Sequence, residues 1–274
     1  MDDNAHCLDV LRMHDRDRYL SSLLLPEKYR DDCVALYAFN AEIARVRDVV
    51  SEPMPGEIRL QWWRDAIAND GEGARANPLA NALLKVITKH NLPRDAFDKM
   101  LLARAFDLYD DPMPSMGDLE GYAGETTSLL FQLSALIAGT ESSSQLAECC
   151  GHAGVCYALM TILRDLPRHS SRGQLYLPAD ILKNVGAQPA LILSGDMHEG
   201  LPKALTKMIA LCRDHKEKAV VSLDELPSSL RPAFLPLCLI EPHLRKMEKA
   251  GFNPFADRMK ISQLRAQWAL WRGQ

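Results

Sequence analysis

Residues 154–178 read GVCYALMTILRDLPRHSSRGQLYLP, and this stretch combines a helical pattern with a cluster of charged side chains. Apolar and small residues fill its first half at helical spacing, and the glycines and alanines would let neighbouring backbones approach closely. Because proline interrupts helical hydrogen bonding, the sequence predicts a helix over residues 141–166, ended by Pro167 and followed by a loop over residues 168–178.

The same periodicity governs the rest of the chain, so we expect an all-α fold. No segment alternates apolar and polar residues for long enough to indicate a strand, and no linker rich in Gly, Ser or Pro divides the chain. The sequence therefore predicts one all-α domain over residues 1–274. Further helices are predicted over residues 33–50, from 57 to 68, 79–90, 94–108, 117–138, 201–221, 229–249 and 261–271. The last of these carries Ile261, Leu264, Trp268 and Trp271 on one apolar stripe.

Composition excludes several classes of protein. The 274 residues are 47% hydrophobic and 25% charged, which is typical of a globular protein, and the net charge of −4 argues against a nucleic-acid binder. Seven scattered cysteines without a C-x-x-C pair indicate neither a disulfide framework nor a zinc site. The acidic N-terminus and the lack of an apolar run of about 20 residues favour a cytoplasmic protein without a membrane span. We single out no basic amphipathic helix with a lipid-facing stripe.

Three sequence features occur in order along the chain: LYAF at residues 36–39, ILRD at residues 162–165 and RGQLYLP at residues 172–178. In this combination the chain resembles the squalene and phytoene synthase family of head-to-head prenyltransferases. The resemblance implies an isoprenoid-synthase-type helical bundle. In catalytic members two facing helices carry aspartate-rich tracts, whose carboxylates hold the Mg²⁺ ions that neutralise a departing diphosphate.

This chain departs from the family pattern at the expected metal ligands. The three aspartates of D-D-x-x-D fall on Ala44, Arg45 and Asp48, and those of D-x-x-x-D fall on Asp165 and His169. About three negative charges are therefore missing, and neutral imidazole is a poor ligand for Mg²⁺. We expect no cofactor.

The replacement pattern has its own likeness within the family. Residues 39–52 and the sequence RLQWWR at residues 59–64 look like the branch that contains the mitochondrial complex I assembly factor related to phytoene synthases, and its bacterial relatives. Members of that branch are regarded as non-enzymes. The likeness implies a binding or assembly role, with respiratory complex subunits as partners and a place at the inner membrane, which the protein would contact peripherally.

Positive charge remains in the tracts that would line the diphosphate end of the cavity. Arginine binds phosphate oxygens bidentately without a metal. We therefore expect a prenyl diphosphate or a lipid phosphate to bind here without being ionised, which also admits a peripheral lipid-phosphate carrier. The candidate residues are Arg45, Arg47, Arg164, Arg168 and Arg172, together with Tyr176.

The alternative is a working Mg²⁺-dependent prenyltransferase. Its reduced metal site would use Asp48, Glu52 and Asp165, with Glu42 as a further ligand. Against this, Asp48 and Glu52 lie four residues apart beside two arginines, and this spacing predicts salt bridges on a helix surface.

Two simpler interpretations concern His169 and the adjacent tryptophans. We expect His169 to be a solvated loop residue, since it follows Pro167 in a polar segment. Trp62 and Trp63 cannot share one narrow helix face, so one is expected in the core and the other exposed toward a partner.

Overall fold

The structure is a computed structural model that describes residues 2–69, 73–257 and 259–273. These residues form helices and turns, and no strand occurs among them, which confirms the predicted all-α fold. The helices are α1 (Asp3–His14), α2 (Arg16–Ser22), α3 (Glu27–Ala44), α4 (Pro53–Ala68), α5 (Pro78–Lys89), α6 (Arg94–Arg104), α7 (Met116–Ala123), α8 (Leu129–Ile137), α9 (Ser144–Ser170), α10 (Ala179–Val185), α11 (Pro189–Leu193), α12 (Gly200–Asp224), α13 (Ile240–Met247) and α14 (Gln263–Arg272). Three 3₁₀ segments, η1 (Val46–Asp48), η2 (Ala105–Leu108) and η4 (Ser228–Leu239), and one π-helical segment, η3 (Gly124–Ser128), complete the order.

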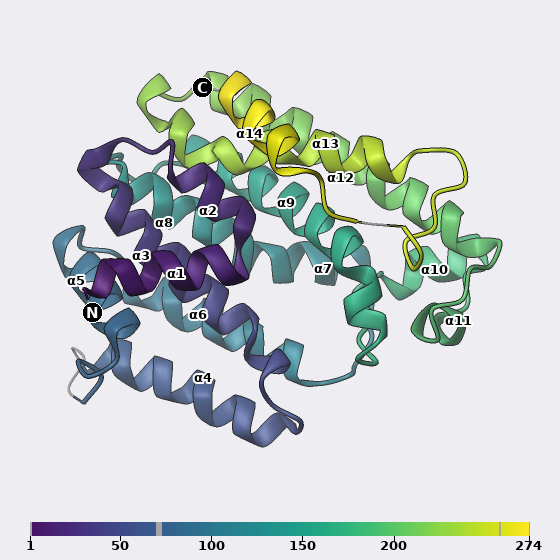
Figure 1. The fold of residues 1–274 in the computed structure, drawn as a ribbon, viewed down its shortest axis with the longest axis horizontal. Helices are drawn as coiled ribbons and strands as arrows, with labels where there is room; N and C mark the ends of the chain where they lie inside the picture. Colours follow the sequence, from purple (N-terminus) through teal and green to yellow (C-terminus); the bar gives the residue numbers. More distant parts are fainter. Residues whose placement is uncertain (1, 70–72, 258, 274) are drawn as a thin grey trace.

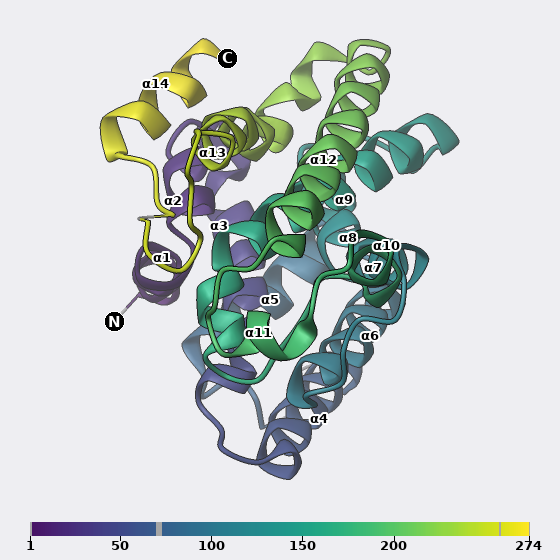
Figure 2. The ribbon, with the colours of Figure 1, turned by 90° about the vertical axis from the view of Figure 1, so that its right-hand side faces the viewer.

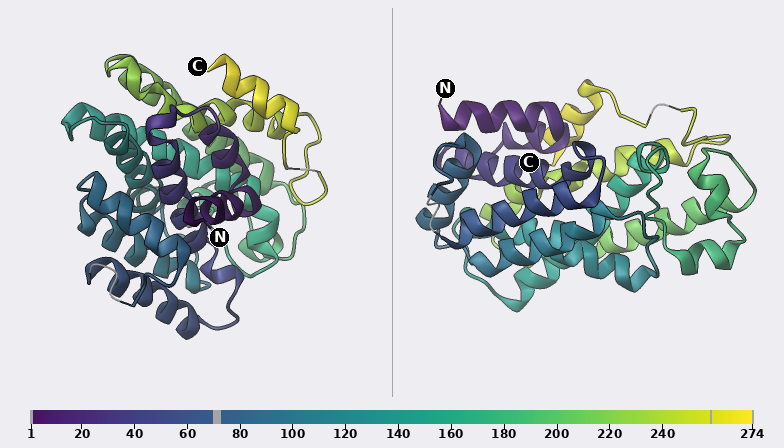
Figure 3. Two further views of the ribbon diagram at one scale, coloured as in Figure 1. Left: turned by 60° about the vertical axis from the view of Figure 1, so that its left-hand side comes forward. Right: turned by 90° about the horizontal axis from the view of Figure 1, so that it is seen from below.

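The helices form a bundle around α9, which runs through the middle of the molecule with α12 alongside (Figure 1). A second group, α1, α3, α5 and α8, packs together around a separate cluster of buried side chains. The view from below shows the two groups side by side along the long axis of the bundle (Figure 3). The facing ends of α3 and α9 therefore lie between two hydrophobic cores.

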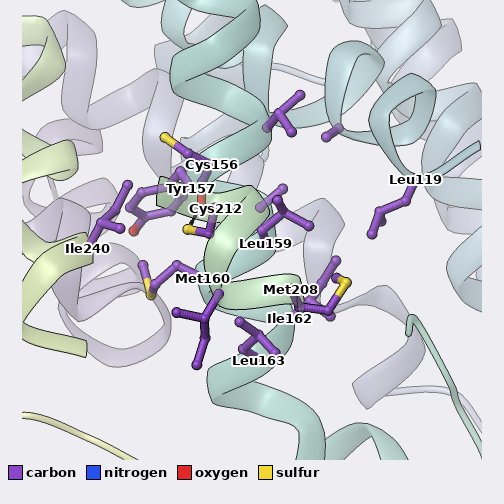
Figure 4. Close-up of a cluster of buried hydrophobic side chains, with 14 of the residues drawn as sticks. Leu119, Cys156, Tyr157, Leu159, Met160, Ile162, Leu163, Met208, Cys212 and Ile240 are labelled. Atoms are coloured by element: carbon purple, nitrogen blue, oxygen red, sulfur yellow. Dashed lines mark hydrogen bonds between the residues drawn. The ribbon is translucent and has the colours of Figure 1, made fainter. Parts of the chain in front are cut away.

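Buried hydrophobic side chains fill the interface between α9 and α12 (Figure 4). Met160, Leu163 and Met208 are all buried there, and the Cys212 thiol lies 3.1 Å from the carbonyl oxygen of Cys156. Helix α9 is long and apolar enough to cross a membrane, but 72% of its most apolar window is buried inside the fold. Its hydrophobicity therefore serves the protein core.

Gly154 lets α9 approach η3. A β-carbon at this position would lie 2.4 Å from the Cα of Ser128, which is closer than real side chains come to backbone. Gly151, one turn earlier on the same helix, would meet nothing within 4 Å. The close approach that the small residues of this segment indicate is thus confirmed at Gly154.

Helix α9 continues past Pro167, contrary to the predicted end at residue 166. The carbonyl oxygen of Pro167 accepts a hydrogen bond from the Ser171 amide at 3.1 Å, so the proline, which lacks an N–H group to donate, still takes part in the final turn as an acceptor. Gly173, with φ of +77°, then ends this region. His169 therefore lies on a helix, and its expected place in a solvated loop is wrong.

The helix predicted over residues 33–50 begins and ends six residues earlier in the structure, as α3. Helix α3 ends at Ala44, and the backbone of Arg45 leaves the helical region with φ of −104° and ψ of 8°. The following turn buries Val46 and carries Asp48 in η1. Helix α4 then starts with Pro53, whose fixed φ suits the first helical position, rather than after Gly56.

The predicted apolar stripe of the C-terminal helix is also divided by the structure. Ile261 precedes α14 and is buried, so it does not share the helical register of the residues that follow. Leu264, Trp268 and Trp271 instead face solvent. By contrast, the separation of the adjacent tryptophans is confirmed: Trp63 is 4% exposed and Trp62 is 39% exposed.

We predict that Gly154→Ala lowers the free energy of unfolding by about 1–3 kcal/mol, because the added methyl group collides with the backbone of η3. Gly151→Ala should leave stability unchanged or raise it by up to about 1 kcal/mol, since alanine favours the helix and nothing obstructs it. Urea unfolding of both variants measures the difference. Equal effects of the two substitutions would contradict the account.

Candidate functional site

A cavity of about 450 Å³ lies where α2, the C-terminal part of α3, α9 and α14 meet. This volume is in the range of small-molecule sites. Its walls are unusually rich in charge, with arginine and aspartate side chains alternating around one end. The charged end forms because η1 turns toward the last turns of α9, which bring the basic residues after ILRD into the same space.

Asp48 and Asp165 are bridged by one arginine. Arg168 donates from Nη1 to Oδ2 of Asp48 and from Nη2 to Oδ2 of Asp165, both at 3.2 Å. Arg172 forms a second ion pair with Asp48. Each of the two carboxylates therefore already has a cation against it, and η1 is tied to α9.

Arg164 provides the second cation for Asp165 and extends the network to α2. It donates from Nε to Asp165 at 3.0 Å and from Nη1 to Asp17 at 2.6 Å. Burial alone would raise the pKa of Asp165, but Arg164 and then Arg168 outweigh this and hold that pKa below its ordinary value. Both partners of the pair are therefore charged at neutral pH.

Arg45 also lines the cavity. Its guanidinium lies 2.9 Å from Nε2 of His14 and 3.5 Å from Glu42, a longer contact than the other ion pairs of the site. Glu42 in turn accepts from Arg59 at 3.2 Å. Like the two aspartates, Glu42 is paired with arginines.

The remaining candidates lie away from the cavity wall. Arg47 donates to the carbonyl oxygen of Val50 at 3.2 Å and to Asp110 at 3.3 Å. Glu52 is an exposed residue at the start of α4. Asp48 and Glu52 do not share a helix face, because α3 ends before either residue. Asp48 pairs with Arg168 of α9 and with Arg172 just after it, rather than with Arg45 or Arg47.

A second polar cluster, which the sequence analysis missed, surrounds Asp107 in η2. Its carboxylate accepts from the hydroxyl groups of Tyr122 and Tyr176, both at 2.7 Å, and from Arg104 at 3.1 Å. The side-chain amide of Gln174 donates to the backbone carbonyl oxygen of Asp107 at 2.8 Å. Tyr176 thus lines the cavity, but its hydroxyl group is committed to Asp107.

Two histidines at the cavity are held in the neutral form. Burial lowers the pKa of His169 to about 4, and it likewise lowers the pKa of His243 to about 4. Within the described part of the chain, neither ring nitrogen of His243 nor Nδ1 of His169 has a hydrogen-bond partner. The same holds for the side-chain oxygen of buried Asn40, so three residues that line the cavity carry buried polar atoms without a hydrogen-bond partner.

These residues do not fit a magnesium centre. Magnesium needs several oxygen ligands in near-octahedral geometry, usually carboxylates together with substrate phosphates. The carboxylates at this end already accept from guanidinium groups, and the described residues contain no group of three His, Cys, Asp or Glu side chains arranged to hold a metal ion. The cations of this site are arginines.

The chain belongs to the squalene/phytoene synthase family, whose model matches residues 11–272. A curated relative, NADH dehydrogenase (ubiquinone) complex I, assembly factor 6 from Rattus norvegicus, is 31% identical over 93% of this chain and 76% of that protein. The Homo sapiens protein of the same name is 31% identical over 91% of this chain and 75% of its own length. A phytoene synthase from Rhodobacter capsulatus is 21% identical over 96% of this chain and 78% of that protein.

Solved structures show the same fold. A dehydrosqualene synthase superposes with a TM-score of 0.85 over 99% of this chain and 95% of that chain, at 19% identity. A squalene synthase from Alicyclobacillus acidocaldarius gives a TM-score of 0.79 over 92% of this chain and 95% of that chain, at 20% identity. The isoprenoid-synthase-type helical fold that the resemblance implies is thereby confirmed.

We predict that stability depends on pH between about 4 and 6.5. Because the folded-state pKa values of His169 and His243 are lowered to about 4, the unfolded chain binds more protons in this window. The free energy of unfolding should therefore fall as the solution is acidified, by up to about 1.4 kcal/mol per pH unit for each histidine. His243→Gln should remove one such contribution in urea titrations at several pH values. If the free energy of unfolding of His243→Gln changed with pH as steeply as that of the native protein, the prediction would be contradicted.

Proposed function

We propose that this protein is a non-catalytic binding or assembly factor for a respiratory complex of the NADH dehydrogenase type. The observation that carries the proposal is the Asp48–Arg168–Asp165 bridge, in which arginine stands against the carboxylates that remain from the metal-binding tracts. The 31% identity to proteins named complex I assembly factor 6 supports the choice of partner. Subunits of such a complex are the proposed protein partners, and no cofactor is required.

The pairing of carboxylates with arginines at this site explains why we expect no ionisation of a prenyl diphosphate. Ionising a prenyl diphosphate requires divalent ions that bind the leaving group and act as Lewis acids. At this site a metal ion would have to displace Arg164, Arg168 and Arg172 from their carboxylates. The guanidinium groups are fixed to the chain and permanently protonated, so they neutralise charge but leave too few free oxygen ligands for a metal cluster.

The proposed ligand of the cavity is a prenyl diphosphate or a lipid phosphate, bound without metal. Arg45, Arg164 and Arg168 line the cavity and present guanidinium groups that match phosphate oxygens. The carboxylates compete with a phosphate for these groups. The cavity would therefore hold a phosphate group weakly and without turnover, at a place that we propose is cytoplasmic and peripheral to the inner membrane.

The enzyme alternative is tested by incubating the protein with farnesyl or geranylgeranyl diphosphate and Mg²⁺. We expect no condensation product, whereas a squalene synthase assayed in parallel should give one. In the host organism, deletion of the gene should reduce assembled NADH dehydrogenase, and a gene encoding Asp48→Asn/Asp165→Asn should restore it. Turnover on the order of 1 per second, or failure of the folded double variant to restore assembly, would contradict the proposal.

Metal-free ligand binding is tested by calorimetry with farnesyl diphosphate in EDTA. Asp48→Asn should raise the affinity at least about threefold, because it frees Arg168 and Arg172 and removes a negative charge. Asp110→Asn is the matched control, since Asp110 pairs with Arg47 outside the cavity wall, and it should bind as the native protein does. In a magnesium site the loss of Asp48 would instead weaken binding when the titration is repeated with Mg²⁺ in place of EDTA. No heat with the native protein, or weaker binding by Asp48→Asn, would contradict the proposed ligand.

A further inference from the structure

Helix α14 presents an apolar stripe to solvent. Leu264 is 80% exposed, Trp268 is 59% exposed and Trp271 is 62% exposed, and the spacing of these residues places them on one side of the helix. The two indole rings lie beside each other, with centroids 5.4 Å apart. Figure 2 shows α14 at the edge of the molecule, with α13 and α2 on its inner side.

The fold does not require this stripe. The inner side of α14 is formed by Ala266 and Leu270, and together with Ile261 these residues are buried against Leu20, Leu235 and Leu239. Tryptophan and leucine side chains left exposed on the other side lose the free energy that burial would give. An exposed stripe of this kind indicates a surface that another body covers.

The charge around the stripe has one sign. Although the whole chain has a net charge of −4, residues 258–274 contain four basic residues and no acidic one. Among the described residues, Lys260, Arg265 and Arg272 are exposed. This combination of tryptophan, leucine and basic residues is typical of helices that lie in the interface of an anionic membrane.

A second exposed stripe, on α4, has a different charge around it. Met54 is 70% exposed and Ile58 is 64% exposed. The sequence around them, residues 52–65, contains three acidic residues and two arginines. That stripe has no excess of positive charge, so it lacks the attraction to anionic lipid that α14 has. The two stripes therefore form a natural pair of test and control surfaces.

We propose that α14 docks on the surface of an anionic phospholipid bilayer, with Leu264, Trp268 and Trp271 in the headgroup region. Specific protein interfaces use about 20–30 residues on each side, whereas this stripe offers three large side chains on one ten-residue helix. Insertion into lipid needs no larger complementary surface, since binding scales with the buried apolar area and the attraction to anionic headgroups.

Docking through α14 also places the cavity at the membrane. Lys260, Ile261 and Ala266 line the cavity, and Arg16 of α2 donates to Gln263 at 3.1 Å, so the start of α14 forms part of the cavity wall. Met13, also in the wall, is 68% exposed. This inference deepens the membrane location proposed above.

The test is sedimentation with vesicles of phosphatidylcholine alone or mixed with phosphatidylglycerol. The native protein should sediment with the mixed vesicles, and less at high salt. Leu264→Ser/Trp268→Ser/Trp271→Ser should reduce its partition at least about tenfold, while the control Met54→Ser/Ile58→Ser should sediment as the native protein does. Arg265→Gln/Arg272→Gln, which alters only exposed charges, should also reduce binding to the mixed vesicles about tenfold.

Three outcomes would overturn the inference. The native protein could fail to bind mixed vesicles, or the α14 and α4 variants could bind equally well. Alternatively, the α14 substitutions could abolish self-association, measured by analytical ultracentrifugation, without changing vesicle binding, which would make a second copy the occupant. The arginine variant keeps the test valid if the triple variant unfolds. None of these outcomes bears on the condensation and gene-restoration assays, so the two proposals fail separately.

Discussion

Arg168 holds η1 to α9 by donating one nitrogen to Asp48 and the other to Asp165. A partly buried carboxylate is costly unless a cation stands against it, and here the chain supplies that cation itself. The site of this protein is therefore assembled and largely neutral before any ligand binds, which suits recognition more than ionisation chemistry.

The fold was largely predictable, because periodic apolar positions determine which side of a helix is buried. The exceptions are local. Pro167 does not end α9, because its own carbonyl oxygen accepts from the Ser171 amide and so closes the last turn. Helix α3 ends at Ala44, and the chain then turns and buries Val46. This end depends on tertiary packing, which helix propensity alone does not predict. Ile261 lies outside the register of α14 for a similar reason.

The site was less predictable, because its side chains come from distant parts of the chain. Alignment to the family motifs identified the lost ligands and the surplus of arginines, but it did not show which carboxylates the arginines contact. Asp17 and Asp107 were missed, since neither lies in a motif, although Arg104 three residues before Asp107 was a weak signal for a local ion pair. Arg47 was expected in the cavity and instead contacts Asp110, because the turn after Ala44 directs it there.

The most direct test of the account counts the divalent ions that the protein binds together with a diphosphate. Manganese can replace magnesium and gives an electron paramagnetic resonance signal when free, so its loss reports binding. Titration of the protein with Mn²⁺ in the presence of a non-hydrolysable farnesyl diphosphate analogue should leave the free signal equal to that of a protein-free control containing the same analogue. Two or three tightly bound Mn²⁺ ions per chain would contradict the proposal that arginines stand in place of the metal.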